Sequence, residues 1–114
     1  LPPMSMRLPG ASYKTVFDRG RVLRGRLLTL YAWQTQDAGN RAGVVISRKS
    51  FHDATDRNRA KRILRAGHAM ARAALVARLG PCECVLVGRR ALEGRKAQDV
   101  ARELESLAGR CGKS

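Results

Sequence analysis

Two spacings of apolar residues alternate along this chain, one typical of helices and the other of strands. Near the N-terminus, Tyr13, Val16 and Phe17 recur at positions i, i+3 and i+4, which places them on one face of a helix. Ser12 is a residue type that caps helices, and Gly20 is one that ends them. We therefore expect a short amphipathic helix as the first element.

A spacing of two follows, which predicts strands. The segment 26–33 predicts a strand with two different faces. One face carries Leu28, Leu30 and Ala32, and the other carries Leu27, Thr29, Tyr31 and Trp33. Residues 37–40 (Asp-Ala-Gly-Asn) have the composition of a turn, and residues 41–48 predict a second strand. Gly43, like Gly88 further on, lies inside a predicted strand and indicates a bulge or a close contact.

Helical spacing returns at Asp53, a capping residue, and is expected to continue to about residue 78, with a bend near Gly67. A short buried strand at 84–89 and an amphipathic helix at 95–109 follow. The buried side of this last helix is expected to hold Val100, Ala101, Leu104, Leu107 and Ala108. The order α-β-β-(β)-α-β-α, in which the strand in parentheses is optional, predicts an α+β sandwich.

The charge of the chain is strongly one-sided. Its 114 residues include 23 Lys and Arg against 9 Asp and Glu, which gives a formal net charge of +14. Such a charge opposes compaction and seldom occurs without a polyanionic partner. Most of the basic residues are arginines, which bind phosphate through two nitrogens and stack on bases. Nucleic acid is therefore the first candidate partner, and an anionic membrane surface is the second.

Other features narrow the class of protein. The length suits one domain, which we place at residues 7–114 behind a flexible tail at 1–6. No run of 18 apolar residues is present to span a membrane, and the N-terminus lacks the apolar core of a secretory signal. We expect inert thiols in a reducing cytoplasm, and no structural metal, from the odd number and the spacing of Cys82, Cys84 and Cys111.

Positive charge is concentrated on the predicted second helix. At about 100° per residue, one arc of roughly 140° holds Arg57, Asn58, Lys61, Arg62 and Arg65, with Arg59 at its border. The opposite arc holds Ala60, Ile63, Leu64, Gly67, Met70, Ala71 and Ala74. Solvated helix faces usually mix charges of both signs, whereas like charges four residues apart repel. A self-repelling arc of this kind indicates binding to phosphates.

These residues carry a family resemblance. The strand "VVISRK" at 44–49, followed after a loop by "RNRAKRILR" at 57–65, resembles the protein subunit of bacterial ribonuclease P. In that family a strand ends in two basic residues, and the next helix opens with Arg-Asn-Arg, followed by Lys-Arg and an aliphatic pair. Tyr13 and Phe17 are similar to the aromatic pair of the family's first helix, and "CVLVGRR" at 84–90 resembles its last strand.

The resemblance implies a small mixed sheet flanked by helices, with a left-handed βαβ crossover around the basic helix. It also implies a non-catalytic, monomeric protein in a one-to-one cytoplasmic ribonucleoprotein with a catalytic RNA. That RNA, with bound Mg²⁺, cleaves the 5′ leader from precursor tRNA to make the mature 5′ end. The sequence agrees with a non-catalytic role, because it offers no Ser/His/Asp or Cys/His set and no plausible pair of carboxylates.

By the same resemblance, two surfaces contact RNA. The catalytic RNA is expected at Arg48, Lys49, Arg57, Asn58, Arg59, Lys61, Arg62 and Arg65. The leader of the precursor is expected in a cleft between the first helix and the sheet, at Tyr13, Phe17, Tyr31 and Arg89. Single strands are generally held by basic grooves with stacking rings. Burial in an ordinary core remains the alternative for the aromatic residues, and a solvated strand end remains the alternative for the basic pair.

Two segments depart from the family pattern. His52-Asp53-Ala54-Thr55 lacks the glycine of the family's loop, and Ala66-Gly67-His68 replaces an acid and an aromatic residue, which is expected to weaken the packing of the helix. Three other functions stay open. A ribosomal or other structured-RNA binding protein fits the composition equally well, a DNA-binding helix-turn-helix lacks its first helix here, and a small enzyme lacks a catalytic set.

Overall fold

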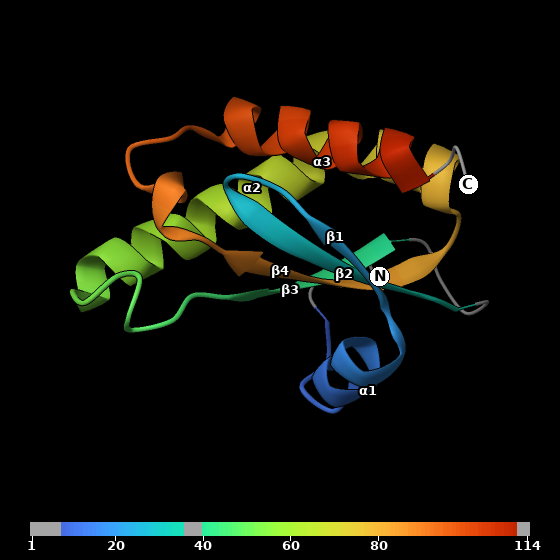
Figure 1. Cartoon of the computed structure of the whole chain (residues 1–114), viewed down its shortest axis with the longest axis horizontal. Helices are drawn as coiled ribbons and strands as arrows, with labels where there is room; N and C mark the ends of the chain where they lie inside the picture. The colour runs from blue at the N-terminus through green and yellow to red at the C-terminus, as the bar shows by residue number, and fades with distance from the viewer. Residues whose placement is uncertain (1–7, 36–39, 112–114) are drawn as a thin grey trace, which may run out of the picture.

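The computed structural model describes residues 8–35 and 40–111, which form three layers (Figure 1). One layer is helix α1 (Ser12–Arg19), which packs on one face of a four-stranded sheet. The opposite face is covered by helices α2 (Ala54–Leu79) and α3 (Ala97–Cys111). The predicted α+β sandwich is therefore confirmed.

The sheet is mixed. Its strands are β1 (Arg21–Arg24), β2 (Leu28–Gln34), β3 (Asn40–Val45) and β4 (Cys82–Gly88). They lie in the order β1-β2-β4-β3, with β3 parallel to β4 and the other neighbours antiparallel. Because α2 joins the parallel neighbours β3 and β4, the βαβ unit implied by the resemblance is present.

Strand β1 was not predicted at this place, because the optional strand of the predicted order stood after the two predicted strands, whereas β1 precedes both of them. It has four residues, begins and ends with arginine, and is largely exposed. Its pairing with β2 makes a hairpin, which explains why β2 begins at Leu28 and not at residue 26. The predicted tail at 1–6 and the predicted turn residues 37–39 lie outside the described residues.

The predicted second strand is too long. Strand β3 ends at Val45, and Arg48 and Lys49 lie in a turn that follows it, not at a strand end. Two hydrogen bonds close this turn, from the Phe51 amide to the Ser47 carbonyl (3.1 Å) and from the Ser50 amide to the Ser47 hydroxyl (3.2 Å). Serine bonds its own turn in this way in preference to a ladder, which is why the strand stops early.

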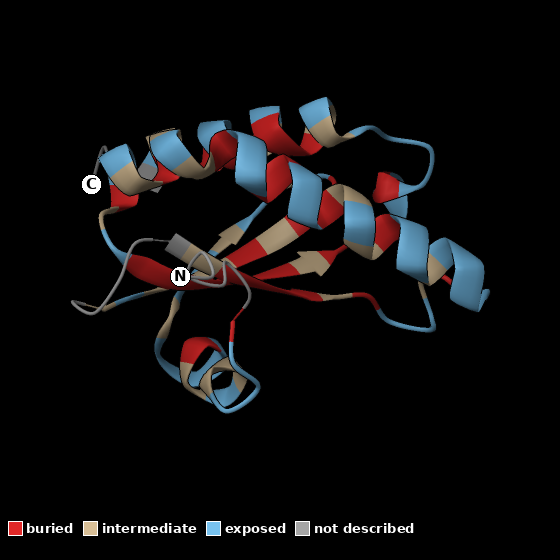
Figure 2. Cartoon of the chain, turned by 180° about the vertical axis from the view of Figure 1, so that it is seen from behind, coloured by how far each residue is buried: buried red, intermediate tan, exposed pale blue. Residues whose placement is uncertain are grey.

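The predicted alternation is confirmed from Leu28 onward, whereas Leu27, expected on the face of Tyr31, lies before β2 and packs in the larger core. Leu28 and Leu30 are fully buried in the larger core, toward α2 and α3, whereas Tyr31 and Trp33 pack in a smaller cluster with Val16 of α1. The central strand β4 is buried along nearly its whole length because elements cover both of its faces, as the red ribbon in Figure 2 shows. A sheet covered on both faces buries apolar side chains in two separate layers.

Helices α2 and α3 pack closely, and the predicted buried side of α3 is confirmed. Gly67 is buried in α2, and a Cβ atom there would clash with Val100 of α3. The expectation that the Ala66-Gly67-His68 segment weakens packing is wrong at this position, because the missing side chain lets α3 approach. Helix α2 also continues through Gly67 without interruption.

Helix capping follows the sequence at one helix and not at the other. The side chain of Asp53 accepts a hydrogen bond from the Thr55 amide (3.1 Å), as expected for the cap of α2. At α1 the capping position is Ala11, so Ser12 is the first helical residue and the expectation for it was wrong. Its first amides bond to the carbonyls of Pro9 and Gly10.

Candidate nucleic-acid interface

The first turns of α2 present an exposed polar stripe, which we call the α2 stripe, formed by Asn58, Arg59, Arg62 and Arg65. It points away from the core, because Ala60, Leu64 and Ala71 bury the opposite side of the helix. In the part of the chain that the structure describes, none of these three arginines has a carboxylate partner. The stripe is therefore a run of positive charge without internal neutralisation.

The helix is rotated relative to the predicted arc. Met70, expected inside, is 55% exposed, while His68 is buried at 3% exposure. Burial, with a smaller contribution from the positive charge of Arg72, lowers the pKa of His68 from 6.5 to about 4. A neutral imidazole can enter the core, and the rotation moves Arg57 and Lys61 to the half-buried border of the stripe.

Arg57 has a structural role that the sequence did not predict. Its Nη1 donates hydrogen bonds to the carbonyl oxygens of Phe51 (3.0 Å) and His52 (2.7 Å). The ring of Phe51 is buried, so Arg57 fastens the loop that enters α2. Within the described ranges, only glycines have positive φ angles. The loop that lacks the family's glycine is therefore built without strained backbone.

A second surface lies where α1 meets the sheet, and we call it the α1 cleft after the cleft expected there from the resemblance. Phe17 is 38% exposed and meets Tyr31 edge to face, with ring centroids 4.8 Å apart. Tyr13 is half-buried, and its ring lies over Gly43 of β3, where a Cβ atom would clash with it. The close contact expected at Gly43 is thus confirmed, and it seats α1 on the sheet.

Sheet residues beside α1 form the floor of the α1 cleft. Thr29 pairs with Val87, and Val87 pairs with Val45, so these three half-buried side chains stand in one row on the face that carries Tyr31. Arg24, opposite Thr29, extends the row toward the exposed edge of the sheet. This floor was not predicted from the sequence, because alternation gives the face of each strand but not the order of the strands.

Arg89 is exposed and follows β4 in an extended conformation. Its Nη1 donates to the carbonyl oxygen of Gly25 (2.9 Å), and its amide donates to the carbonyl oxygen of Leu27 (2.8 Å). The residue therefore stands beyond the end of the floor at Val87 and is held against the β1–β2 loop. The predicted cleft residues Tyr13, Phe17 and Tyr31 are brought together, with Arg89 at one end.

Two pairs of polar side chains lie in the sheet. Glu83 is buried and forms an ion pair with Arg41 on the neighbouring strand. The sulfur atoms of Cys82 and Cys84 lie 3.5 Å apart in the core, and their hydrogen bond lowers the pKa of Cys82. Across residues 8–35 and 40–111, no group of three or more His, Cys, Asp and Glu side chains is placed to hold a metal ion.

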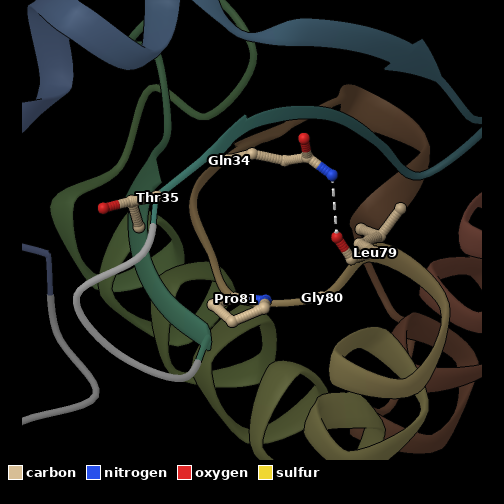
Figure 3. Close-up of a pocket in the computed structure, with 5 residues that line it drawn as sticks. All are labelled: Gln34, Thr35, Leu79, Gly80 and Pro81. Carbon is tan, nitrogen blue, oxygen red and sulfur yellow. Dashed lines mark hydrogen bonds between the residues drawn. The ribbon is translucent and has the colours of Figure 1, made fainter.

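A depression of about 380 Å³ at the C-terminal end of α2 differs from these basic surfaces (Figure 3). Its lining consists of Gln34, Thr35, Leu79, Gly80 and Pro81. The side-chain amide of Gln34 donates to the Leu79 carbonyl (3.3 Å) and so ties β2 to the end of the helix. None of the lining side chains is charged, which leaves this depression without an attraction for polyanions.

The fold and its surfaces define a small α+β protein with an exposed basic helix and a partly aromatic surface beside α1. A family model described as Ribonuclease P matches residues 6–112, and the chain belongs to this family. Within the ranges described, none of the helices has the length and apolar character needed to cross a membrane.

Curated relatives share part of the sequence. The chain is 46% identical over 55 residues to the ribonuclease P protein component of Xanthomonas oryzae pv. oryzae (strain MAFF 311018). The aligned residues make up 48% of this chain and 37% of that relative. The chain is also 38% identical over 53 residues to the ribonuclease P protein component of Vesicomyosocius okutanii. That alignment covers 46% of this chain and 47% of the relative. The matched region thus spans less than half the length of these relatives.

Solved structures share the fold over a longer stretch. The RNase P protein from Thermotoga maritima superposes with a TM-score of 0.75 at 23% identity, covering 91% of this chain and 96% of that one. The RNase P protein of Staphylococcus aureus gives a TM-score of 0.74 at 16% identity, covering 94% and 95%. At these identities the likeness concerns the fold.

Proposed function

We propose that the chain is the protein subunit of a ribonuclease P ribonucleoprotein. In this role it binds the catalytic RNA and the 5′ leader of precursor tRNA, and it assists the RNA in cutting the leader from the tRNA. Membership of the family supports the proposal. The single observation that carries it is the α2 stripe, whose arginines are exposed and have no carboxylate partners among the described residues.

The α2 stripe is the proposed contact to the catalytic RNA. Guanidinium groups without internal partners are available to phosphate oxygens, and each can bind through two parallel hydrogen bonds. Arg48 and Lys49, exposed in the turn before α2, extend the same positive surface. Arg57 and Lys61 contribute from its border, and Arg57 also positions the stripe by fixing the loop at Phe51.

The α1 cleft is the proposed contact to the leader. Single-stranded RNA presents unstacked bases, which proteins hold on aromatic side chains next to basic groups. Phe17 and Tyr31 offer such rings, and the half-buried row at Val87 gives the bases an apolar floor. Arg24 and Arg89 are exposed near this floor, where they can meet the phosphates of an extended strand.

In this proposal the chemistry belongs to the RNA. The Mg²⁺ that cleavage requires is held mainly by RNA phosphates. The protein adds positive charge and binds the leader. The complex is proposed to hold one protein and one RNA and to work in the cytoplasm. A protein that only positions its partners needs fixed geometry and surface charge, and both are features of the α2 stripe and the α1 cleft.

Reconstitution tests the proposal. The protein is mixed with a bacterial ribonuclease P RNA, and cleavage of a precursor tRNA is followed at low Mg²⁺ with and without protein. We expect protein-dependent cleavage at the mature 5′ end, because added positive charge lowers the need for free Mg²⁺. Tight RNA binding without stimulation, seen with several bacterial RNAs, would favour the second candidate, a ribosomal or other structured-RNA binding protein.

A further inference from the structure

Three arginines outside both surfaces surround a small depression. It has a volume of about 150 Å³ and lies between the β1–β2 loop and the start of α3, and we call it the arginine depression. Arg26 comes from the loop, Arg95 precedes α3, and Arg102 stands within α3. All three are exposed, and the buried side chain of Leu27 lines the same depression.

The two acids in the lining are already occupied by backbone amides. The carboxylate of Glu103 accepts hydrogen bonds from the amides of Arg26 (2.9 Å), Leu27 (2.8 Å) and Leu28 (3.0 Å). Asp99 accepts one from the amide of Lys96 (2.9 Å). These acids fasten the loop and the first turn of α3, and within the described residues neither forms an ion pair with an arginine.

The guanidinium groups are consequently free. Among the residues whose placement is described, the side chains of Arg26, Arg95 and Arg102 have neither a hydrogen bond nor an ion pair. Three cations that line one depression without an ion-pair partner are available to attract an anion between them. A volume of about 150 Å³ is several times the roughly 30 Å³ that a water molecule occupies in the liquid. It can therefore admit a phosphate group.

We propose that the arginine depression binds a phosphate of the catalytic RNA, as a third contact beside the α2 stripe and the α1 cleft. The proposal rests on the proposed function, since it assumes that this RNA is the partner. Guanidinium forks match phosphate oxygens in geometry and charge.

The position of the depression supports a shared partner. Leu28, next to the loop, pairs with Gly88 at the end of β4, and Arg89 is bonded to the loop at Gly25. Because β3 and β4 are parallel, the end of β3 that leads into α2 lies at the same end of the sheet. The start of α2 and the segment before α3 also lie at the same end of the molecule in Figure 1. One RNA can therefore reach both.

Two double variants with the same loss of charge test the inference. Arg95→Gln/Arg102→Gln removes two guanidinium groups from the depression, and Arg19→Gln/Arg78→Gln removes two from exposed sites on α1 and at the far end of α2. Affinity for the ribonuclease P RNA alone, without tRNA, is measured over a series of salt concentrations. We expect the first variant to lower the slope of log K against log[salt] by about one to two, and the second to change it much less.

Equal slopes and equal affinities for the two double variants would overturn the inference. Arg26→Gln must change affinity in the same direction as the first variant, and an unchanged value would also count against the site. The melting temperature should stay unchanged in every variant, because the side chains removed have no partners among the described residues. If the wild type fails to stimulate cleavage, the proposed function fails; if it stimulates but the slopes are equal, only this inference fails.

Discussion

The α2 stripe and the α1 cleft are built in opposite ways. The stripe lies on one helix, its members are at most seven positions apart, and it is exposed and polar. The cleft combines α1 with three strands, and it is partly buried and partly aromatic. A surface on one helix can change residue by residue without harm to the fold, whereas a surface shared by four elements serves as binding site and core together.

The largest effect is expected from neutralising the α2 stripe. Arg59→Gln/Arg62→Gln/Arg65→Gln should weaken binding of the ribonuclease P RNA by about 100-fold or more and lower the salt slope by about three, since each arginine meets a phosphate. The melting temperature should not fall. Filter binding over a salt series and a thermal melt provide the measurement. A loss of affinity no larger than that of Arg19→Gln/Arg78→Gln would contradict a specific role for the stripe.

The buried side of α2 should make the stability of the protein depend on pH, through His68. The pKa of His68 is lowered from 6.5 to about 4, so the unfolded chain binds a proton more readily than the folded one between these values. Stability is therefore fully present above pH 6.5 and is lost as the pH falls toward 4, by about 3 kcal/mol at most. Urea unfolding across this range measures the loss.

His68→Leu is the matched variant for this measurement, because it fills the same buried position with a side chain that does not titrate. Its free energy of unfolding should be less dependent on pH between 6.5 and 4 than that of the wild type. The remaining dependence would come from the carboxylates. Identical pH profiles for the two proteins would show that the histidine is not held neutral by burial.

In the α1 cleft, loss of the Phe17 ring should weaken binding of leader-bearing precursor tRNA but not of mature tRNA. Phe17→Ala should raise the dissociation constant of the assembled enzyme for leader-bearing precursor by about 5- to 150-fold, since stacking on a base contributes about 1 to 3 kcal/mol. Affinity for mature tRNA should be unchanged. Met70→Ala, which removes another exposed apolar side chain, is the control. Equal loss for both RNAs would remove Phe17 from leader binding.

Arg57 and Arg62 both lie on α2, but only Arg57 is expected to affect stability as well as RNA affinity. Because it bonds two loop carbonyls, Arg57→Gln should cost about 1 to 2 kcal/mol of stability in addition to RNA affinity. Arg62→Gln should cost affinity alone. Paired urea unfolding and RNA titration of the two variants separate these effects. Equal stability of the two variants would show that the hydrogen bonds from Arg57 to the loop carbonyls do not stabilise the fold.

The same contrast explains what the sequence could predict. The spacing of apolar residues located α1, α2, α3 and β4, and the charge pattern located the stripe, because these signals are local. The burial of His68 and the exposure of Met70 were not predicted, because histidine is usually treated as polar and methionine as apolar. Strand β1 was not predicted, because four largely exposed residues bear little pattern.

Contacts between distant residues were beyond the sequence. The floor of the α1 cleft depends on β4 lying between β2 and β3, which no single segment encodes. Glu103 bonds the amide of Arg26 across 77 positions, and this contact helps to create the arginine depression. Gly67 looked like a weakness of α2 until its neighbour Val100 was placed against it.

The most direct test of two separate surfaces is precursor cleavage at rising protein concentration by reconstituted enzymes that carry either Arg62→Gln/Arg65→Gln or Phe17→Ala. The stripe variant should reach the wild-type rate once protein is in excess, because only its assembly with the RNA is weakened. The Phe17→Ala enzyme should stay slow at low precursor concentration however much protein is added. A stripe variant that never recovers, or a cleft variant that does, would contradict the division of labour between α2 and α1.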